Sequence, residues 1–406
     1  MNELGARIKA LRKEKKLTLE MLAGDKMSKG MMSLIENGKA QPSMESLQHI
    51  AKQLQVEVAE LIGDGQAKFR RDLLKRAESL YETPSSYELP NYLGLIELIQ
   101  PHLEKLSLNY ESAKLEEYYA KACFHLKKEE WEVFYLSAKH KYEKLHLYSS
   151  YASLLLMRAM VEFQLHHYED ALTLAIKEYE SFEEKTIVLD PMTKLDYLYI
   201  ISVLNSAIGQ DDKADLWMEE AIAYAIEKRV FYRIDDLYRL ACFRAMMNGE
   251  EDKRRYYIEK LRLYADFTER KDSHEYALIM NAHFYTTFEE NPEMAWSYLE
   301  NFPETDDSND FYMLEMAKYR NLTGEYTTSL ELLKQVTISS NIHHPYDLSM
   351  MYDKYRVQAL NEMGLGNHEN ALMAIEQGLK ANEGIPETVY VKKLMKLQKE
   401  IESESR

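Results

Sequence analysis

Six short breaks recur at nearly even spacing between residues 166 and 372, and this repeat constrains the fold more than any other feature of the sequence. Each break separates two helical patterns, of which the first is rich in Leu and Tyr and the second carries a small residue at a fixed offset. The breaks begin at residues 166, 209, 249, 290, 324 and 366, so the intervals are 43, 40, 41, 34 and 42 residues. Repeats of this length are typical of helical hairpins stacked into a superhelical solenoid.

The composition also favours helices. The 406 residues include only 14 Gly and 9 Pro, which leaves few residues for the many tight turns of a β-sandwich. The breaks at 324–329 and 366–371 carry a Gly, an aromatic or His, and a small residue, a pattern that resembles the tetratricopeptide repeat. We therefore predict an all-α chain in which residues 90–406 form a right-handed tetratricopeptide-repeat superhelical solenoid. Most intervals exceed the roughly 34 residues of that repeat, so we expect some longer helices.

The formal net charge of −17 is unevenly distributed along the chain. Residues 1–62 contain ten Lys or Arg and eight Asp or Glu, a net charge of +2, so the other 344 residues carry −19. An acidic total would normally argue against nucleic-acid binding. The asymmetry instead indicates a head that binds nucleic acid, joined to an acidic body.

The head has the pattern of a five-helix bundle with a tight turn between its second and third helices. Thr18 and Ser28 are good N-caps for those two helices, and Gly38 suits the end of the third. The segments LTLEMLA, SKGMMSLIENGK and PSMESLQHIA occur in the order found in the Xre/Cro-type helix-turn-helix family, which the head resembles. Two features differ from that family: Leu19 stands where many members have a Gln that contacts DNA, and the turn is one residue shorter.

The third helix of the head carries the expected DNA contacts. Its N-terminal amides and positive dipole end suit phosphate, and its side chains can reach base edges in the major groove. Asn37 and Lys39 follow where a loop would touch the backbone of the duplex. The alternative is that Met31 packs in the core and Lys29 is simply solvated. The expected DNA-binding residues are Thr18, Ser28, Lys29, Gly30, Met31, Ser33, Asn37 and Lys39.

Residues 63–89 are predicted to contain a linker helix, FRRDLLKRAESLYE, with a basic face. A basic amphipathic helix can bind a membrane surface or an anionic partner, but a helix that connects the head (1–62) to the body (90–406) is the simpler interpretation.

The first helix of each repeat is expected to line the concave face of the solenoid, where polar residues of consecutive repeats form a groove for an extended peptide. Asn can pair with a peptide backbone, Arg can hold a carboxylate, and Tyr or Phe can form side-chain pockets. The alternative is ordinary solenoid packing with solvated charges. The expected peptide-binding residues are Tyr199, Asn205, Asp236, Arg239, Asn281, Glu315, Lys318, Tyr319, Asp353 and Arg356, with Ser202, Phe243 and Phe284 beside them.

The sequence gives no sign of catalytic chemistry, so we expect no catalytic residue, metal ion or cofactor. The pairs His166–His167 and His343–His344 point in different directions on a helix and lack carboxylates at matching offsets. Two cysteines, Cys123 and Cys242, rule out a disulfide framework. The N-terminus has no apolar core of a signal peptide, and no apolar run is long enough to span a membrane. These features predict a cytoplasmic protein.

An Xre-type head followed by a tetratricopeptide body resembles the RRNPP family of peptide-pheromone receptors, and most closely its NprR branch. The resemblance implies a transcription regulator that binds promoter DNA with its head and a short signalling peptide in its concave groove. It also implies a homodimer formed through the repeats, which assembles into a tetramer with peptide in some members. The Tyr- and Met-rich stretch 346–363 is the expected dimer interface.

Two other functions remain open. The NprR branch and its Rap relatives resemble proteins that bind a response regulator of the sporulation relay and promote its dephosphorylation. The basic helix around Arg70, Arg71, Lys75 and Arg76 would be the docking site for that partner. Alternatively, the chain is a phage-type repressor that responds to no peptide.

Overall fold

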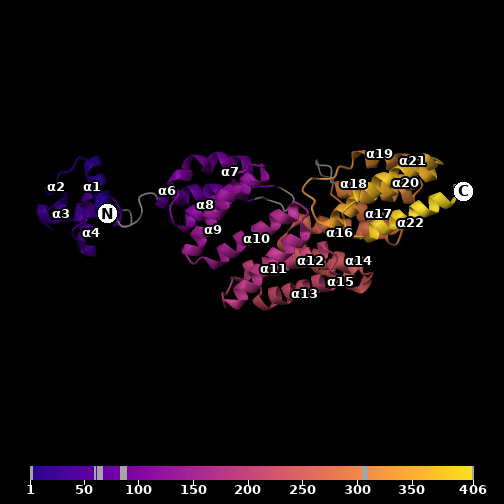
Figure 1. Cartoon of the computed structure of the whole chain (residues 1–406), viewed down its shortest axis with the longest axis horizontal. Helices are drawn as coiled ribbons and strands as arrows, with labels where there is room; N and C mark the ends of the chain where they lie inside the picture. The colour runs from indigo at the N-terminus through magenta and orange to yellow at the C-terminus, as the bar shows by residue number, and fades with distance from the viewer. Residues whose placement is uncertain (1–2, 59–60, 62–66, 83–88, 304–309, 405–406) are drawn as a thin grey trace. The chain divides into compact units, whose positions relative to one another are not determined.

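The structure is a computed structural model of the whole chain, and it describes residues 3–58, 61, 67–82, 89–303 and 310–404. Within these ranges the regular structure is helical throughout, as the sequence predicts (Figure 1). The chain divides into two compact units, residues 1–145 and 146–406, and each is described here by itself. None of the described helices is both long enough and apolar enough to cross a membrane.

The head contains helices α1 (Glu3–Glu14), α2 (Leu19–Ala23), α3 (Lys29–Glu36) and α4 (Met44–Leu54). The side chains of Ile8, Leu22, Met32 and Ile50 are fully buried in one core between them. The hydroxyls of Thr18 and Ser28 accept backbone N–H groups at the starts of α2 and α3, as predicted, and the hydroxyl of Ser43 does the same at the start of α4. The predicted fifth helix, 56–62, lies partly outside the described residues, although Val58 and Leu61 are helical.

Helix α1 is fixed against the end of α3 by one buried ion pair and one close backbone contact. The guanidinium of Arg12 donates to both carboxylate oxygens of Glu36, at 2.6 and 2.9 Å, and the Glu36 side chain is only 3% exposed. This pair raises the pKa of Arg12, chiefly through the hydrogen bond to Glu36. A Cβ atom placed on Gly5 would lie within 2.8 Å of the Glu36 carbonyl oxygen and closer still to that of Ile35. Gly5 therefore allows the two helices to approach.

A second helical group follows in the first unit: α6 (Ala67–Tyr81), α7 (Tyr92–Ile99), the 3₁₀ helix η1 (Gln100–Lys105), α8 (Tyr110–His125) and α9 (Trp131–Lys144). The predicted linker helix is α6, and its Leu73, Leu74 and Ala77 share a core with α7 and α8. On its other side Arg71, Lys75 and Arg76 are exposed, whereas Arg70 is buried. The predicted domain limit after residue 62 lies outside the described residues, and the predicted limit after residue 89 lies just before α7.

Glu117 of α8 is the most deeply buried charge among the described residues of this group. Its carboxylate accepts from the ammonium groups of Lys114 and Lys121 and from the Tyr142 hydroxyl, at 2.7 to 3.0 Å. Burial opposes the charge, but the two ammonium groups outweigh it and lower the pKa of Glu117 to about 2. The carboxylate therefore stays ionised inside the core.

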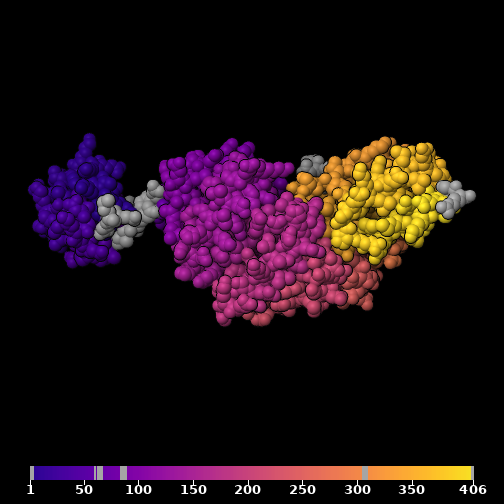
Figure 2. Space-filling view, viewed as in Figure 1, coloured from indigo at the N-terminus to yellow at the C-terminus, as the bar shows by residue number. Residues whose placement is uncertain are grey.

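The second unit is a stack of antiparallel helix pairs followed by a single C-terminal helix (Figure 1). Each pair packs on the next, and the largest buried apolar cluster joins α10 to α14, while separate clusters lie between the later helices. The helices are α10 (Tyr148–Gln164), α11 (Tyr168–Glu184), α12 (Pro191–Ala207), α13 (Asp211–Lys228), α14 (Ile234–Met247), α15 (Glu251–Thr268), α16 (Lys271–Thr287), α17 (Pro292–Leu299), α18 (Asp310–Leu322), α19 (Tyr326–Gln335), α20 (Pro345–Gly364), α21 (His368–Ala381) and α22 (Val389–Glu404). Figure 2 shows that the C-terminal residues, in yellow, lie directly against the orange residues that precede them.

At every predicted break the chain reverses direction in a hairpin turn, and one residue of each turn has the left-handed backbone conformation, with a positive φ angle. Four of these residues are Gly209, Gly249, Gly324 and Gly366, with φ between 70° and 81°. Glycine adopts this conformation without a steric penalty, so these glycines are the reason that the repeat could be recognised in the sequence. The other two breaks use His166 (φ 64°) and Glu290 (φ 50°).

The small residues at the fixed offset lie where the two helices of a pair touch. Ala171, Ala214, Ala295 and Ala371 are fully buried, and the Ser329 hydroxyl donates to the Ala317 carbonyl across the pair at 2.6 Å. The repeat that begins at 249 has an arginine at this offset. Arg254 is 2% exposed, donates to the Asn281 side chain at 2.8 Å and lies 4.0 Å above the Phe284 ring.

Replacing Gly5 with Ala is expected to destabilise the head by about 1–3 kcal/mol, because the new methyl group meets backbone oxygens that cannot move aside. Hydrogen exchange measured by mass spectrometry should show faster exchange in α1 and α3. Gly30→Ala is the matched control, since its Cβ would meet only the Ser28 hydroxyl at 3.8 Å and its helix propensity improves. Equal exchange rates in the two variants would contradict the packing described for α1 and α3.

Candidate functional site

The predicted DNA-binding residues lie together around α2 and α3 of the head, and most of them face solvent. Seven of the eight are exposed, and Ser33 is half-buried. Met31 is 46% exposed whereas its neighbour Met32 is fully buried, so Met32 fills the core and Met31 is available for contact. The exposed residues are Thr18, Ser28, Lys29, Gly30, Met31, Asn37 and Lys39.

Several of these side chains already have a local partner. The Lys29 ammonium lies 2.8 Å from the Glu20 carboxylate, and both side chains are more than half exposed. An exposed pair of this kind contributes about 0–1 kcal/mol, so Lys29 can exchange Glu20 for a phosphate at little cost. Asn37 donates to the carbonyl of Ser33 at 2.8 Å, which fixes its position at the end of α3.

The short turn between α2 and α3 is fixed by Gly24 and His49. Gly24 has φ 58°, and a Cβ at this position would lie 2.9 Å from the His49 ring. The Nε2 atom of His49, in α4, lies 2.8 Å from the Ala23 carbonyl oxygen at the end of α2. This contact sets the direction in which α3 begins, and the sequence pattern gave no indication of it.

In the second unit, three of the predicted peptide-binding residues lie in a partly buried network of acidic and basic groups on α12, α14 and α16 and on the residues that cap α14 and α16. Arg233 donates to Asp196 and to Asp236, each at 2.8 Å, and its guanidinium lies 5.3 Å above the Tyr199 ring. The two carboxylates raise the pKa of Arg233 against the effect of burial. Asp196 and Arg233 were not predicted, and their side chains are 18% and 31% exposed.

The network continues toward α16 through Arg239. Its guanidinium donates to the Ser273 hydroxyl at 2.9 Å, lies 3.6 Å from the Asp272 carboxylate and stacks 5.0 Å above the Tyr276 ring. Arg270 binds Asp272 from the other side and lowers its pKa to about 2. We call this set the charged ladder: Asp196, Tyr199, Arg233, Asp235, Asp236, Arg239, Arg270 and Asp272.

The next four predicted residues, Glu315, Lys318, Asp353 and Arg356, form a separate buried network on α18 and α20. Lys318 contacts Glu315 at 2.8 Å and Asp353 at 3.4 Å, and Arg356 donates to Asp353 at 2.6 Å. All four side chains are at least 90% buried. Each charge is paired inside the protein, so in this structure the network is part of the core rather than of an open groove.

His283 of α16 and Tyr390 of α22 complete this buried network. The imidazole Nδ1 lies 2.8 Å from Glu315, and the Tyr390 hydroxyl donates to Nε2 at 2.8 Å. Burial and the nearby Lys318 ammonium lower the pKa of His283, which favours the neutral ring that can accept from Tyr390. The sequence gave no reason to connect Tyr390 with a residue 107 positions earlier.

Helix α22 covers this part of the stack through more than Tyr390. The Thr388 hydroxyl lies 2.5 Å from that of Ser349, and the Lys393 ammonium donates to the Thr287 carbonyl. Leu394, Leu397 and Ile401 join a core with α20 and α21. The C-terminal helix therefore closes the stack next to the buried network.

The remaining three predicted residues lie apart from both networks. Asn281 is held by Arg254, and Tyr319 stacks on the Trp296 ring at 5.1 Å. Asn205 is 1% exposed and donates to the Ile201 carbonyl of its own helix, and it borders a cavity of about 340 Å³ beside α11 and α13. The ten predicted residues thus do not form one continuous surface.

The loop between α19 and α20 crosses to the first helix pairs of the same unit. The Tyr168 hydroxyl donates to the His343 carbonyl at 2.8 Å, and Nε2 of His344 lies 3.3 Å from the Val203 carbonyl. The Phe163 ring packs against both imidazoles. Burial lowers the pKa of both histidines, which favours their neutral form in these contacts between the loop and the first helix pairs.

The one group among the described residues that has metal-ligand geometry is Glu162, His167 and Asp170. Their ligand atoms lie within 4.8 Å of one another, so His167 does have nearby carboxylates, contrary to what its sequence neighbours suggested. His167 and Asp170 are exposed, and Glu162 also lies 3.2 Å from Arg158. Local ion pairing therefore accounts for this group.

Comparison with known proteins identifies the head. Residues 8–61 match the helix-turn-helix family HTH_3, so this segment is a helix-turn-helix domain. No curated protein matches the chain.

Solved structures with similar arrangements include PlcR of Bacillus thuringiensis in complex with the peptide PapR7 and DNA, at 18% identity over 68% of this chain and 98% of that one, with a TM-score of 0.40. A tetratricopeptide repeat protein of Parabacteroides merdae is 12% identical over 76% of this chain and 98% of that one (TM-score 0.44). The pheromone receptor Rgg2 of Streptococcus dysgalactiae is 16% identical over 68% and 98% (TM-score 0.32).

Removing a phosphate contact from the head is expected to reduce the salt dependence of DNA binding. Lys29→Ala and Lys39→Ala should each lower the slope of log affinity against log salt by about one unit, because one fewer counterion is released. The slope is measured by fluorescence anisotropy on duplex DNA over a range of salt. Lys334→Ala, an exposed change in α19, serves as the control. Unchanged slopes in both head variants would exclude the proposed phosphate contacts of Lys29 and Lys39.

The stability of the second unit is expected to fall as pH drops from 7 to 5.5. The pKa of His283 is lower in the folded protein than in the unfolded chain, so acid protonates the unfolded chain first and favours it. His343 and His344 act in the same direction. His283→Gln should make the urea midpoint less dependent on pH, whereas His368→Gln removes an exposed imidazole and should not. An equal dependence in all three proteins would refute the role given to His283.

Proposed function

We propose that this chain is a transcription regulator that binds double-stranded DNA through α3 of its helix-turn-helix domain. The observation that carries the proposal is the division of α3 into two faces. Met32 and Ile35 are buried in the core, whereas Ser28, Lys29 and Met31 are exposed to solvent at the N-terminal turn of the helix. A helix N-terminus that presents amides, a cation and a short apolar side chain fits a phosphate and the edges of bases.

One such domain covers only half of a usual binding site. A single recognition helix contacts a few base pairs, so we propose that the protein binds as a homodimer to two half-sites about one helical turn, roughly 34 Å, apart. The acidic body does not oppose this arrangement. Its formal charge of −19 repels the duplex and thereby confines contact to the head.

The charged ladder on α12, α14 and α16 is the proposed site for a short signalling peptide. It is partly buried, with the Arg233 and Arg270 side chains 31% and 40% exposed, its cations and carboxylates alternate, and aromatic rings lie between them. The charged ends of a peptide can replace the outer pairs of Arg233 and Arg270, because these two side chains keep contact with solvent and their pairs are weaker than fully buried ones. The buried network on α18 and α20 offers no comparable surface in this structure.

Peptide binding would alter DNA affinity by linkage. A ligand that joins three consecutive repeats favours one pitch of the stack, and in a dimer that pitch sets the separation of the two heads. Only a separation that matches the half-site spacing gives full affinity.

Native mass spectrometry of the protein purified from its own host tests the ladder. A bound peptide is expected in the wild-type protein, and Arg233→Ala together with Asp236→Ala should remove it. Arg262→Ala, an exposed change in α15, should retain it. Duplex fragments selected from host DNA are then titrated with the protein with and without that peptide. Equal affinities in the two titrations would refute the linkage, and absence of any peptide would favour a regulator that responds to none.

A further inference from the structure

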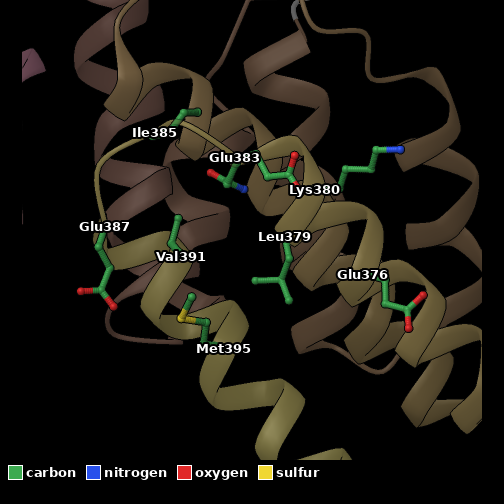
Figure 3. A pocket seen from close by; sticks show the side chains of 9 residues that line it. Glu376, Leu379, Lys380, Glu383, Ile385, Glu387, Val391 and Met395 are labelled. Carbon is green, nitrogen blue, oxygen red and sulfur yellow. The ribbon is translucent and has the colours of Figure 1, made fainter.

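A cavity of about 620 Å³ lies at the C-terminal end of the second unit, between α21, α22 and the loop that joins them (Figure 3). Its apolar part is made by Leu379, Ile385, Val391 and Met395. Val391 is buried, whereas Met395 is 40% exposed, so the apolar surface is open to solvent. The cavity shares no lining residue with the charged ladder or the helix-turn-helix domain.

A close contact between helices holds the walls of this cavity in place. A Cβ on Gly378 of α21 would lie 2.8 Å from a methyl of Leu394 and 2.9 Å from Cβ of Tyr355. Glycine at this position therefore lets α21 pack directly on α22 and α20. Beside this contact, Leu379 of α21 and Val391 and Met395 of α22 border the cavity. The apolar surface belongs to two rigid helices.

The rim of the cavity is acidic. Glu376, Glu383 and Glu387 line it together with one cation, Lys380, so three carboxylates and one ammonium leave a net charge of −2. All four side chains are exposed. In Figure 3 Glu376 and Glu387 lie on opposite sides of the apolar residues, and the Lys380 side chain points away from them.

A buried acceptor borders the same cavity. Asn382 is only 8% exposed and donates from Nδ2 to the Gly378 carbonyl at 2.8 Å. Its Oδ1 atom has no hydrogen-bond partner among the described residues. This oxygen is closed off from solvent, so its missing hydrogen bond costs about 1–3 kcal/mol in the folded protein.

We propose that this cavity binds a basic amphipathic segment of another protein. An aliphatic side chain of that segment occupies the surface of Leu379, Val391 and Met395, and flanking Lys or Arg side chains pair with the glutamates. The rim repels anionic ligands such as phosphates. A second copy of this chain does not fit face to face, because the same acidic rim would meet itself.

The proposal is tested by fluorescence anisotropy on the full-length chain at physiological salt. The probe is a short fluorescein-labelled helical peptide of Leu and Lys only, with Leu at i, i+3, i+4 and i+7, and its counterpart has Glu in place of every Lys. We expect the Lys peptide to bind and the Glu peptide not to bind. Glu383→Gln with Glu387→Gln should weaken binding about fivefold or more, because two charge pairs are lost. Met395→Lys, at an exposed position, should weaken binding further.

A matched control separates this site from the general acidity of the chain. Glu219→Gln with Glu220→Gln, both exposed on α13, changes the net charge equally and should leave the affinity within experimental error. Circular dichroism confirms that each variant is folded. If the control weakens binding as much as the rim variant does, or if both peptides bind alike, the proposal is overturned. It is also overturned if sedimentation velocity shows a dimer that Met395→Lys dissociates, since the occupant is then a second copy.

Discussion

The close approach of two helices at each hairpin turn is the contact on which the rest of the second unit depends. This approach requires a residue with a positive φ angle in the turn, where the chain reverses, and a small residue where the two helices meet. In one pair these residues are Gly209 and Ala214. A non-glycine residue in this conformation destabilises the fold by about 1–2 kcal/mol, and His166 and Glu290 adopt it all the same. The pairs stack at a repeated interval because this contact is repeated, and that stacking brings α12, α14 and α16 side by side to form the charged ladder.

Burial of charge divides the candidate site into two parts with different properties. The ladder around Arg233 is partly exposed, with the Arg233 and Arg270 side chains 31% and 40% exposed, so the pairs of these two side chains are weaker than fully buried pairs. The network around Glu315 and Asp353 is enclosed by α22, and removing one partner there leaves a charge without compensation. The same residue types, on successive repeats, are therefore partly open to solvent in one part of the stack and enclosed by other helices in the other part.

The sequence predicted the helical class, the positions of the hairpin turns and the helix-turn-helix domain, because each depends on local chemistry. Thr18 and Ser28 cap helices wherever they precede an apolar pattern, and Gly366 ends a helix by its own conformational freedom. The separation of exposed Met31 from buried Met32 follows from helical periodicity in the same way. Arg254 could have been noticed, since it interrupts the small-residue offset, but its partners Asn281 and Phe284 lie in the next pair.

What the sequence could not determine depends on contacts between residues far apart in the chain. Periodicity states which face of a helix is apolar but not which later segment covers its polar face. For this reason Glu315, Lys318, Asp353 and Arg356 were expected in an open groove, whereas Tyr390 and Lys393 of α22, with Thr388 just before it, close this part of the stack. The head, the repeat and their charges were determined by the order of residues alone. The division between a partly exposed ladder and an enclosed network was decided only by tertiary structure, because the free-energy cost of burying a charge depends on which groups pack around it.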